Sequence, residues 1–114
     1  MIVVEDCIFC KIIKGEIPAK KVYEDDELLV IYDVAPGAPC HVLLLPKKHM
    51  QNIISADPDA VKYIMGKVGD IARILGVDES GFRLVINTGI DGGQSVEHLH
   101  FHLLGGAKLG WPPC

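Results

Sequence analysis

The stretch "SVEHLHFHLLGG", residues 95–106, places three histidines at alternate positions within an otherwise apolar run. A spacing of two is the period of a β-strand, so His98, His100 and His102 are expected on one face of a strand. A helix does not explain the pattern, because residues two apart on a helix point well away from each other. A single histidine in a sheet is commonly structural, but three in register would each cost about 1–3 kcal/mol without a polar role. The stretch therefore predicts a strand that carries a functional site.

Other short apolar runs bounded by turn residues predict the rest of a sheet. The expected strands lie within residues 22–34 (two strands, joined at Asp25 and Asp26), 40–49 (ending at Pro46), 82–87 and 98–104. One long helix is expected within residues 55–77, where apolar residues recur at helical spacing. Ser55 or Asp57 is its expected cap, and Gly76 its stop. Strands, one long helix and further strands predict an α+β domain with a largely antiparallel sheet.

The composition is that of an ordinary folded domain. The chain has 114 residues, 49% hydrophobic and 23% charged, and we expect one domain over residues 1–114. The net charge of −4 argues against a protein whose main task is to bind nucleic acid. No apolar run approaches the roughly 18 residues of a spanning helix, so no membrane partner is expected. The start "MIVVEDC" does not resemble a signal peptide, which predicts a cytoplasmic protein.

A glycine-rich turn, "NTGIDGGQS", leads directly into the histidines. Its three glycines permit unusual backbone conformations, and Gln94 and Ser95 add side-chain donors. Such a loop can direct several donors at one oxyanion, although the same composition is also common in simple turns. A neutral imidazole is a nucleophile near neutral pH, and donors beside it would stabilise negative charge. The combination predicts nucleophilic attack at phosphorus.

These motifs resemble the histidine triad superfamily, and its Hint branch in particular. The alternating "HLHFHLL" matches the signature, and the resemblance runs from "CIFCKIIKGEIPAKKVYEDD" through "HVLLLPKKH" and "INTGIDGGQSVEHLHFHLLGG" to "WPP". It implies the HIT-like fold: a five-stranded, largely antiparallel sheet with one long helix and a short N-terminal helix. It also implies a purine nucleoside phosphoramidase, which cleaves the P–N bond of substrates such as adenosine 5′-monophosphoramidate or lysyl-AMP.

The resemblance also assigns roles to individual residues. His100 would attack the α-phosphorus and form a nucleotidyl-histidine intermediate, with a backbone carbonyl fixing its tautomer. His102 and His41 would bind the phosphate or the leaving group, and Ser95 would assist the departing amine. The implied nucleotide contacts are Asp33 for the ribose, Ile8, Phe9, Val34 and Leu43 for the base, and Asn87, Gly93, Gln94 and Ser95 for the phosphate. The resemblance further implies a homodimer joined through the long helix and the adjoining strand, in which Trp111 reaches the partner's site.

Two cysteines predict a metal site. Cys7 and Cys10 have the spacing of a zinc knuckle, and His49 and His98 are the further candidate ligands. Some bacterial members of the family resemble this arrangement and bind structural zinc. At the start of its strand, His98 is then expected to turn toward the cysteines. A redox pair and two unligated thiols are the alternatives, the redox pair being disfavoured because no strand precedes Cys7 to place it at a helix start.

Two other functions remain open at this stage. The three strand histidines could coordinate a catalytic metal ion in a hydrolase or oxygenase. The protein could also be a nucleotide-binding regulator whose hydrolysis is incidental. Cys40 and Cys114 receive no role.

Overall fold

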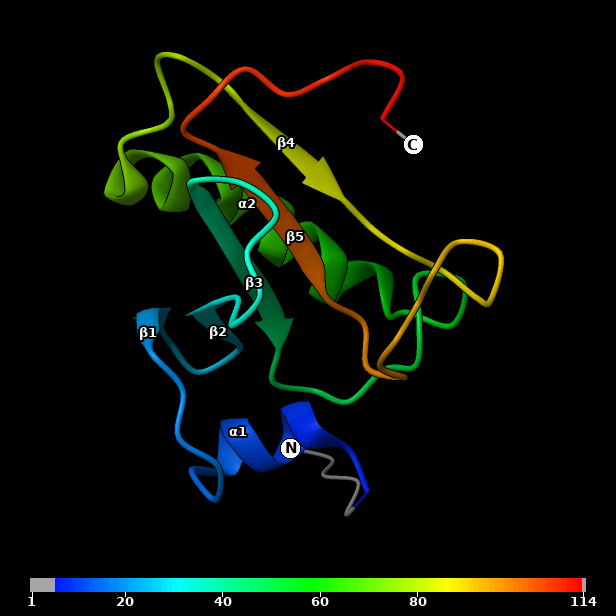
Figure 1. Cartoon of the computed structure of the whole chain (residues 1–114). Coiled ribbons are helices and arrows are strands. Elements are labelled where there is room, and N and C mark those ends of the chain that lie inside the picture. The colour runs from blue at the N-terminus through cyan, green and yellow to red at the C-terminus, as the bar shows by residue number, and fades with distance from the viewer. Residues whose placement is uncertain (1–5, 114) are drawn as a thin grey trace.

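Two helices and five strands follow one another along residues 6–113, the part of the chain that this computed structural model describes (Figure 1). The elements are α1 (Ile8–Lys14), β1 (Lys21–Glu24), β2 (Leu28–Tyr32), β3 (Cys40–Pro46), α2 (Pro58–Leu75), β4 (Phe82–Val85) and β5 (Phe101–Gly105). The predicted zinc knuckle of Cys7 and Cys10 lies at the start of the short helix α1, with Cys7 as its N-cap. Neither helix has the length and apolar composition needed to cross a membrane.

The strands form one antiparallel sheet in the order β1-β2-β3-β5-β4. β3 and β5 lie side by side in its interior, with Leu43 opposite His102 and His41 opposite Leu104. The predicted α+β class, the five-stranded antiparallel sheet and the two helices are confirmed. His41 and His102 therefore lie on strands that are hydrogen-bonded to a neighbouring strand along both edges.

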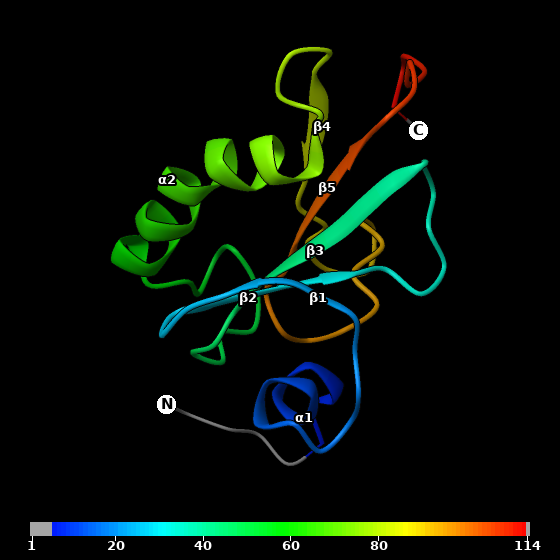
Figure 2. The ribbon, with the colours of Figure 1, turned by 90° about the vertical axis from the view of Figure 1, so that its left-hand side faces the viewer.

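The two helices cover opposite faces of the sheet (Figure 2). Val42, Leu44 and Phe101 belong to the apolar cluster that packs against α2, whereas Leu43 and Leu45 belong to the cluster under α1. This division follows from strand alternation, which sends neighbouring side chains to opposite faces. His41 and His102 share the parity and register of Leu43 and therefore lie on the α1 face.

Helix α2 begins and ends at its predicted signals. Asp57, rather than Ser55, is the N-cap, and its side chain accepts the backbone N–H of Asp59. Gly76 adopts a φ of 72° at the C-cap, a conformation that glycine reaches without strain. Ile64 and Ile71 of the predicted apolar stripe are fully buried, but Met65 is 39% exposed.

Two strands are shorter than the sequence predicts. β4 ends at Val85, before the predicted limit, and β5 begins at Phe101 rather than at His98. The backbone N–H of Leu99 donates to the carbonyl of Met50 at 2.7 Å. The backbone before β5 is therefore bonded to the loop that follows β3 rather than paired with β3 in the ladder, which separates His98 from the strand.

Candidate functional site

Three histidines meet on the α1 face of the sheet. His41 from β3 and His102 from β5 are in contact, with 2.9 Å between Nε2 of the first and Nδ1 of the second. The rings of His100 and His102 have their centroids 5.1 Å apart. Antiparallel pairing of β3 and β5 brings His41 and His102 together, and the segment before β5 adds His100, the third imidazole that the sequence proposed as catalytic.

A backbone amide fixes the protons of His41 and His102. The N–H of Gly37 donates to Nδ1 of His41 at 2.9 Å, so this nitrogen carries no proton. His41 is then protonated on Nε2, which lies 2.9 Å from Nδ1 of His102 and 3.4 Å from Oδ2 of Asp33. Since His41 donates to Nδ1 of His102, the ring proton of His102 is on Nε2. Gly37 was missed by the sequence analysis, because a backbone amide leaves no signal in residue type.

His102 is neutral at physiological pH. Burial, together with the nearby His100 and His41, lowers the pKa of its imidazole to about 4 against the opposing effect of Asp33. A neutral His102 with its proton on Nε2 is a hydrogen-bond donor toward the cleft. It can donate to a phosphate oxygen or to a leaving group.

His100 presents an unshared electron pair. Its Nδ1 lies 2.7 Å from the backbone carbonyl of His98, an oxygen that can only accept, so Nδ1 carries the proton. The ring is 5% exposed and meets the edge of Phe9 at a centroid distance of 5.0 Å. Every fully buried side-chain nitrogen and oxygen of the described residues has a partner. The unbonded Nε2 of His100 is therefore open to the cleft, where a nucleophile is required.

An apolar slot of about 550 Å³ adjoins His100 through Phe9, which lines the slot and contacts the His100 ring. Ile8 and Phe9 form one wall from α1, and Leu43 comes from the sheet. Val34, fully exposed, and Asp33 stand at the rim, so all five residues predicted for base and ribose line one cavity. Oδ1 of the Asp33 carboxylate accepts the backbone N–H of Ala35 at 2.8 Å. That bond orients the carboxylate.

The glycine loop is braced by its own amide side chains. Nδ2 of Asn87 donates to the carbonyl of Gly92 at 2.7 Å. Gly93 has a φ of 77°, and a Cβ at Gly92 would lie 2.4 Å from the carbonyl oxygen of Thr88. Only glycine fits such a close approach at Gly92, and the left-handed conformation at Gly93 favours glycine strongly.

Gln94 ties this loop to the rest of the site. Its Oε1 accepts the N–H of Gly89, and its Nε2 donates to the carbonyls of Gln51 and Val96. The side chain is thus engaged with backbone groups, a role that the sequence did not indicate. Ser95, the next residue, is exposed and lines the apolar slot.

Four side chains form a cluster suited to a metal ion. The sulfur and Nδ1 atoms of Cys7, Cys10, His49 and His98 all lie within 4.8 Å of one another. Nδ1 of His98 is 3.3 Å from the sulfur of Cys7 and 3.1 Å from Nδ1 of His49, which is itself 3.3 Å from the sulfur of Cys10. The structure brings together all four predicted ligands.

The donor atoms of this cluster fit a tetrahedral ion. Zinc bonds of typical length place tetrahedral sulfur and nitrogen ligands roughly 3.3–3.8 Å apart, close to the distances observed. Nε2 of His98 contacts the carbonyl of Pro46 at 2.8 Å, which leaves Nδ1 unprotonated toward the cluster. Burial lowers the pKa of His98 to about 4 and keeps the ring neutral, as a ligand must be.

The cysteines lie at a helix start, contrary to the reasoning that disfavoured a redox pair. Cys7 is the N-cap of α1, and its sulfur accepts the N–H of Cys10 at 3.3 Å. Cys7 and Cys10 are not joined in a disulfide. Because Nδ1 of His49 and Nδ1 of His98 lie beside the two sulfurs, the cluster favours a metal site over a redox pair of cysteines.

The proposal of a catalytic metal held by His98, His100 and His102 is wrong for this geometry. The ring of His98 points to the cysteines, and the clusters of metal-ligand type within residues 6–113 do not unite the three histidines. A second such cluster joins Asp33, His41 and His102. There His41 must keep its Nε2 proton, because Gly37 donates to its other nitrogen. That group is accordingly a hydrogen-bonded relay.

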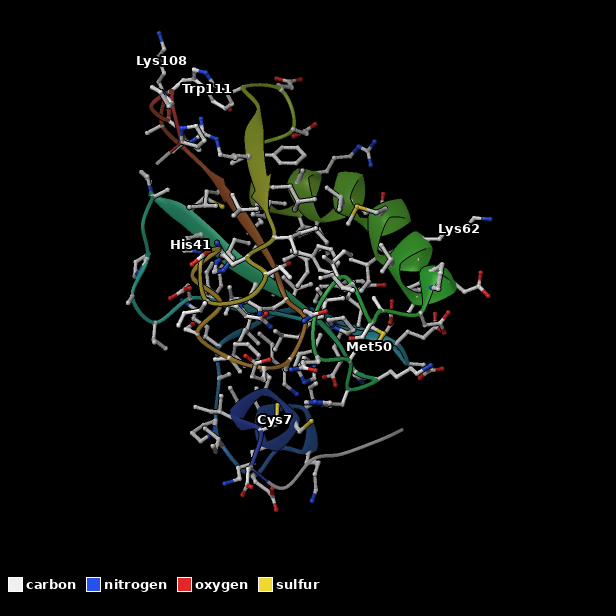
Figure 3. The ribbon with its side chains drawn as sticks, turned by 90° about the vertical axis from the view of Figure 1, so that its right-hand side faces the viewer. Cys7, His41, Met50, Lys62, Lys108 and Trp111 are labelled. Carbon is white, nitrogen blue, oxygen red and sulfur yellow. The ribbon has the colours of Figure 1, made fainter. Side chains whose placement is uncertain are left out.

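Trp111 does not line the slot of its own chain. Its ring is 81% exposed and lies against Arg83, whose guanidinium carbon is 5.8 Å from the ring centroid. Arg83 also donates to the carbonyl of Gly110 at 2.7 Å. In Figure 3, Trp111 and Cys7 lie at opposite ends of the view, with His41 between them.

Known proteins share this sequence and fold. The HIT domain family matches residues 14–109. An uncharacterized HIT-like protein of Synechocystis is 49% identical over 112 residues, which cover 96% of this chain and 97% of that protein. A HIT family hydrolase from Legionella pneumophila superposes with a TM-score of 0.92 at 44% identity, over 96% of this chain and all of that one.

A more distant structure has a functional name. The histidine triad nucleotide-binding protein of Candida albicans has a TM-score of 0.83 and 36% identity, over 94% of this chain and 83% of that one. The family match spans most of the chain and includes His41, His100, His102 and the glycine loop. The chain thus belongs to the HIT domain family.

Proposed function

We propose that this protein is a hydrolase of purine nucleoside 5′-phosphoramidates, such as adenosine 5′-monophosphoramidate and lysyl-AMP, and acts through a covalent nucleotidyl-histidine. One observation carries the proposal: Nδ1 of His100 is bonded to the His98 carbonyl, so Nε2 presents a lone pair to the cleft. The similar structures named a hydrolase and a nucleotide-binding protein support the class.

The reaction follows from the positions of the groups. The base enters the apolar slot and the ribose hydroxyls bond to Asp33, which sets the α-phosphate before His100. Nε2 of His100 forms a bond to phosphorus as the P–N bond breaks, and the amine leaves with a proton from Ser95 or from Nε2 of His102. Water then attacks phosphorus and the bond from phosphorus to Nε2 breaks, while a proton of the water returns to the group that protonated the amine. The nucleotide is released and the neutral imidazole is restored. The glycine loop and the flanking histidines stabilise the charge on the phosphate oxygens.

We further propose zinc as the ion of the Cys7–Cys10–His49–His98 cluster, because thiolate and imidazole donors in tetrahedral spacing select it. Bound there, zinc supplies a structural cross-link between α1 and the sheet, and no catalytic step requires it. Metal analysis of purified protein tests this, with one zinc per chain expected. Zinc retained by both Cys7→Ser and His49→Ala variants would contradict the ligand set.

We also propose a homodimer. β4 is an edge strand, and apolar side chains are exposed on it and on the adjoining helix: Phe82 by 38%, Met65 by 39% and Ile74 by 56%. Pairing two copies through these elements would cover both the strand edge and the apolar surface. The exposed Trp111 would then be available to contact the leaving group in the partner's site.

The decisive experiment uses a fluorogenic adenosine phosphoramidate. Wild-type protein is expected to release the fluorophore and to yield a trapped adenylyl adduct on His100 after acid quench, whereas His100→Ala yields neither. AMP binding by both proteins, measured by calorimetry, serves as the folding control. Binding without turnover or adduct in the wild type would favour a regulatory nucleotide-binding protein and would end the hydrolase proposal.

A further inference from the structure

The four residues of the metal cluster adjoin three parts of the nucleotide site. Cys7 and Cys10 flank Ile8 and Phe9, which are the wall of the apolar slot. Any ion that binds both sulfurs fixes the two residues between them. Helix α1 has seven residues, too few to be stable by itself, and its N-cap is the sulfur of Cys7.

His98 belongs to both sites at once. Its ring lies in the metal cluster, while its carbonyl oxygen accepts the Nδ1 proton of His100 at 2.7 Å. Its Nε2 is held by the carbonyl of Pro46 at 2.8 Å. An ion on Nδ1 of His98 therefore fixes the same residue whose backbone sets the direction of the nucleophile.

His49 connects the cluster to the glycine loop. The next residue, Met50, accepts the backbone N–H of Leu99, and Gln51 accepts a hydrogen bond from the side chain of Gln94. Gln94 in turn holds the N–H of Gly89. The loop that carries His49 thus braces the loop expected to surround the phosphate.

The two sites are also contiguous in space. A cavity of about 610 Å³ borders the cluster at Cys7 and His49. It shares Ile8, Ser95 and Val96 with the apolar slot. Figure 2 shows α1 on its own face of the sheet, where Phe9 and Ile12 pack with Leu43 and Leu45 beside the metal cluster.

We propose that occupancy of the Cys7–Cys10–His49–His98 cluster by a thiophilic divalent ion controls nucleotide affinity, so that metal and nucleotide bind with positive coupling. This inference rests on the proposed nucleotide-binding function. By linkage the coupling is reciprocal: the ion strengthens nucleotide binding by the same factor as the nucleotide strengthens binding of the ion. Couplings between protein sites commonly amount to about 5- to 150-fold.

The test measures both directions with zinc and AMP as probes. Calorimetry compares AMP binding by zinc-loaded and chelator-treated wild type, and competition with a chromophoric chelator measures zinc affinity with and without AMP. Both ratios are expected to exceed fivefold, at the lower end of the usual range of couplings, and to agree with each other. His49→Ala, which leaves the His98 carbonyl and the slot residues in place, is expected to bind AMP like the chelated protein. Cys40→Ser, which removes a thiol outside the cluster, is expected to bind AMP like the loaded wild type.

Hydrogen exchange separates failure of this inference from failure of the proposed function. Zinc removal is expected to raise exchange at the amides of Ile8, Phe9 and Gln94 while far-UV circular dichroism stays unchanged. If AMP bound to neither form, the nucleotide function would fall, and unchanged exchange at these amides would overturn the coupling as well. Equal AMP affinity with and without zinc would also overturn it. Unfolding of the whole chain on zinc removal would replace it by a purely structural role for the ion.

Discussion

The carbonyl oxygen of His98 accepts the Nδ1 proton of His100 at 2.7 Å, across two residues of the same chain segment. Both residues precede the regular strand, which begins at Phe101, whereas in a β-strand the His98 carbonyl would be directed sideways to a neighbouring strand. This bond determines which nitrogen of His100 can react.

Replacement of His100 by alanine tests the nucleophile. The change leaves the slot and the flanking histidines in place, so we expect phosphoramidate turnover to fall by roughly 10³-fold or more while AMP still binds. Single-turnover kinetics and calorimetry measure the two quantities. Turnover within an order of magnitude of the wild type would show that another group attacks phosphorus.

Stability between pH 6.5 and pH 4 tests the buried state of His102. Burial lowers the pKa of His102 from 6.5 to about 4. Between these pH values the imidazole is therefore protonated in the unfolded chain and neutral in the folded chain. The contribution of His102 to stability is therefore complete above pH 6.5 and is lost as the pH falls toward 4. Denaturant unfolding at several pH values is expected to show a shallower decline for His102→Gln than for wild type. Parallel curves would contradict the assignment.

Asp25 joins the β1–β2 turn to α2. Its carboxylate accepts the hydroxyls of Tyr63 at 2.6 Å and Tyr23 at 2.8 Å, together with two backbone N–H groups. Burial by itself raises the pKa of Asp25, but these hydrogen bonds outweigh it and lower the pKa from 3.8 to about 2. Stability from this group is present above pH 3.8 and is lost as the pH falls through 2.

The Asp25→Asn variant removes the charge and keeps the shape. We expect a loss of about 1–2 kcal/mol in the free energy of unfolding at neutral pH, since hydrogen bonds to a charged group are being replaced by weaker ones. Chemical denaturation measures the loss, and Asp26→Asn, on the exposed neighbour, is the matched control. An equal effect in both variants would mean that general charge, rather than the tyrosine contacts, is responsible.

The proposed dimer is tested by Ile74→Glu on α2. A charge on this exposed apolar side chain would be buried without a partner in the interface, so we expect sedimentation to show a shift from dimer to monomer. Ile54, 84% exposed in the loop before α2, provides the control variant Ile54→Glu. A monomeric wild type, or dissociation by both variants, would contradict the proposed interface.

Residue periodicity was sufficient for the sheet, the long helix and the neighbourhood of the histidines. The alternation of Val42 and Leu43 and the caps at Asp57 and Gly76 are local signals, and the structure follows them. The family resemblance predicts that distant residues such as Cys7 and His98 lie in one site. A local sequence pattern does not reveal which residues far apart in the chain come into contact.

The remaining features depend on backbone groups, which residue identity does not reveal. The amide N–H of Gly37 donates a hydrogen bond to Nδ1 of His41, and Pro46 and Met50 hold the segment before β5 through their carbonyls. The engagement of Gln94 with the loops could be found only from coordinates, because its side chain suits a phosphate equally well. Competition between such tertiary bonds and the strand ladder decided where β5 begins.

The placement of β3 and β5 in the sheet interior has a consequence for motion. His41 and His102 are mounted on backbone that is hydrogen-bonded on both sides, whereas Phe9 belongs to a seven-residue helix. Amides of the central strands are expected to open only with global unfolding, and those of α1 by local fluctuation. Nucleotide entry and exit can thus follow local opening of α1, while the backbone that carries His41 and His102 stays in place.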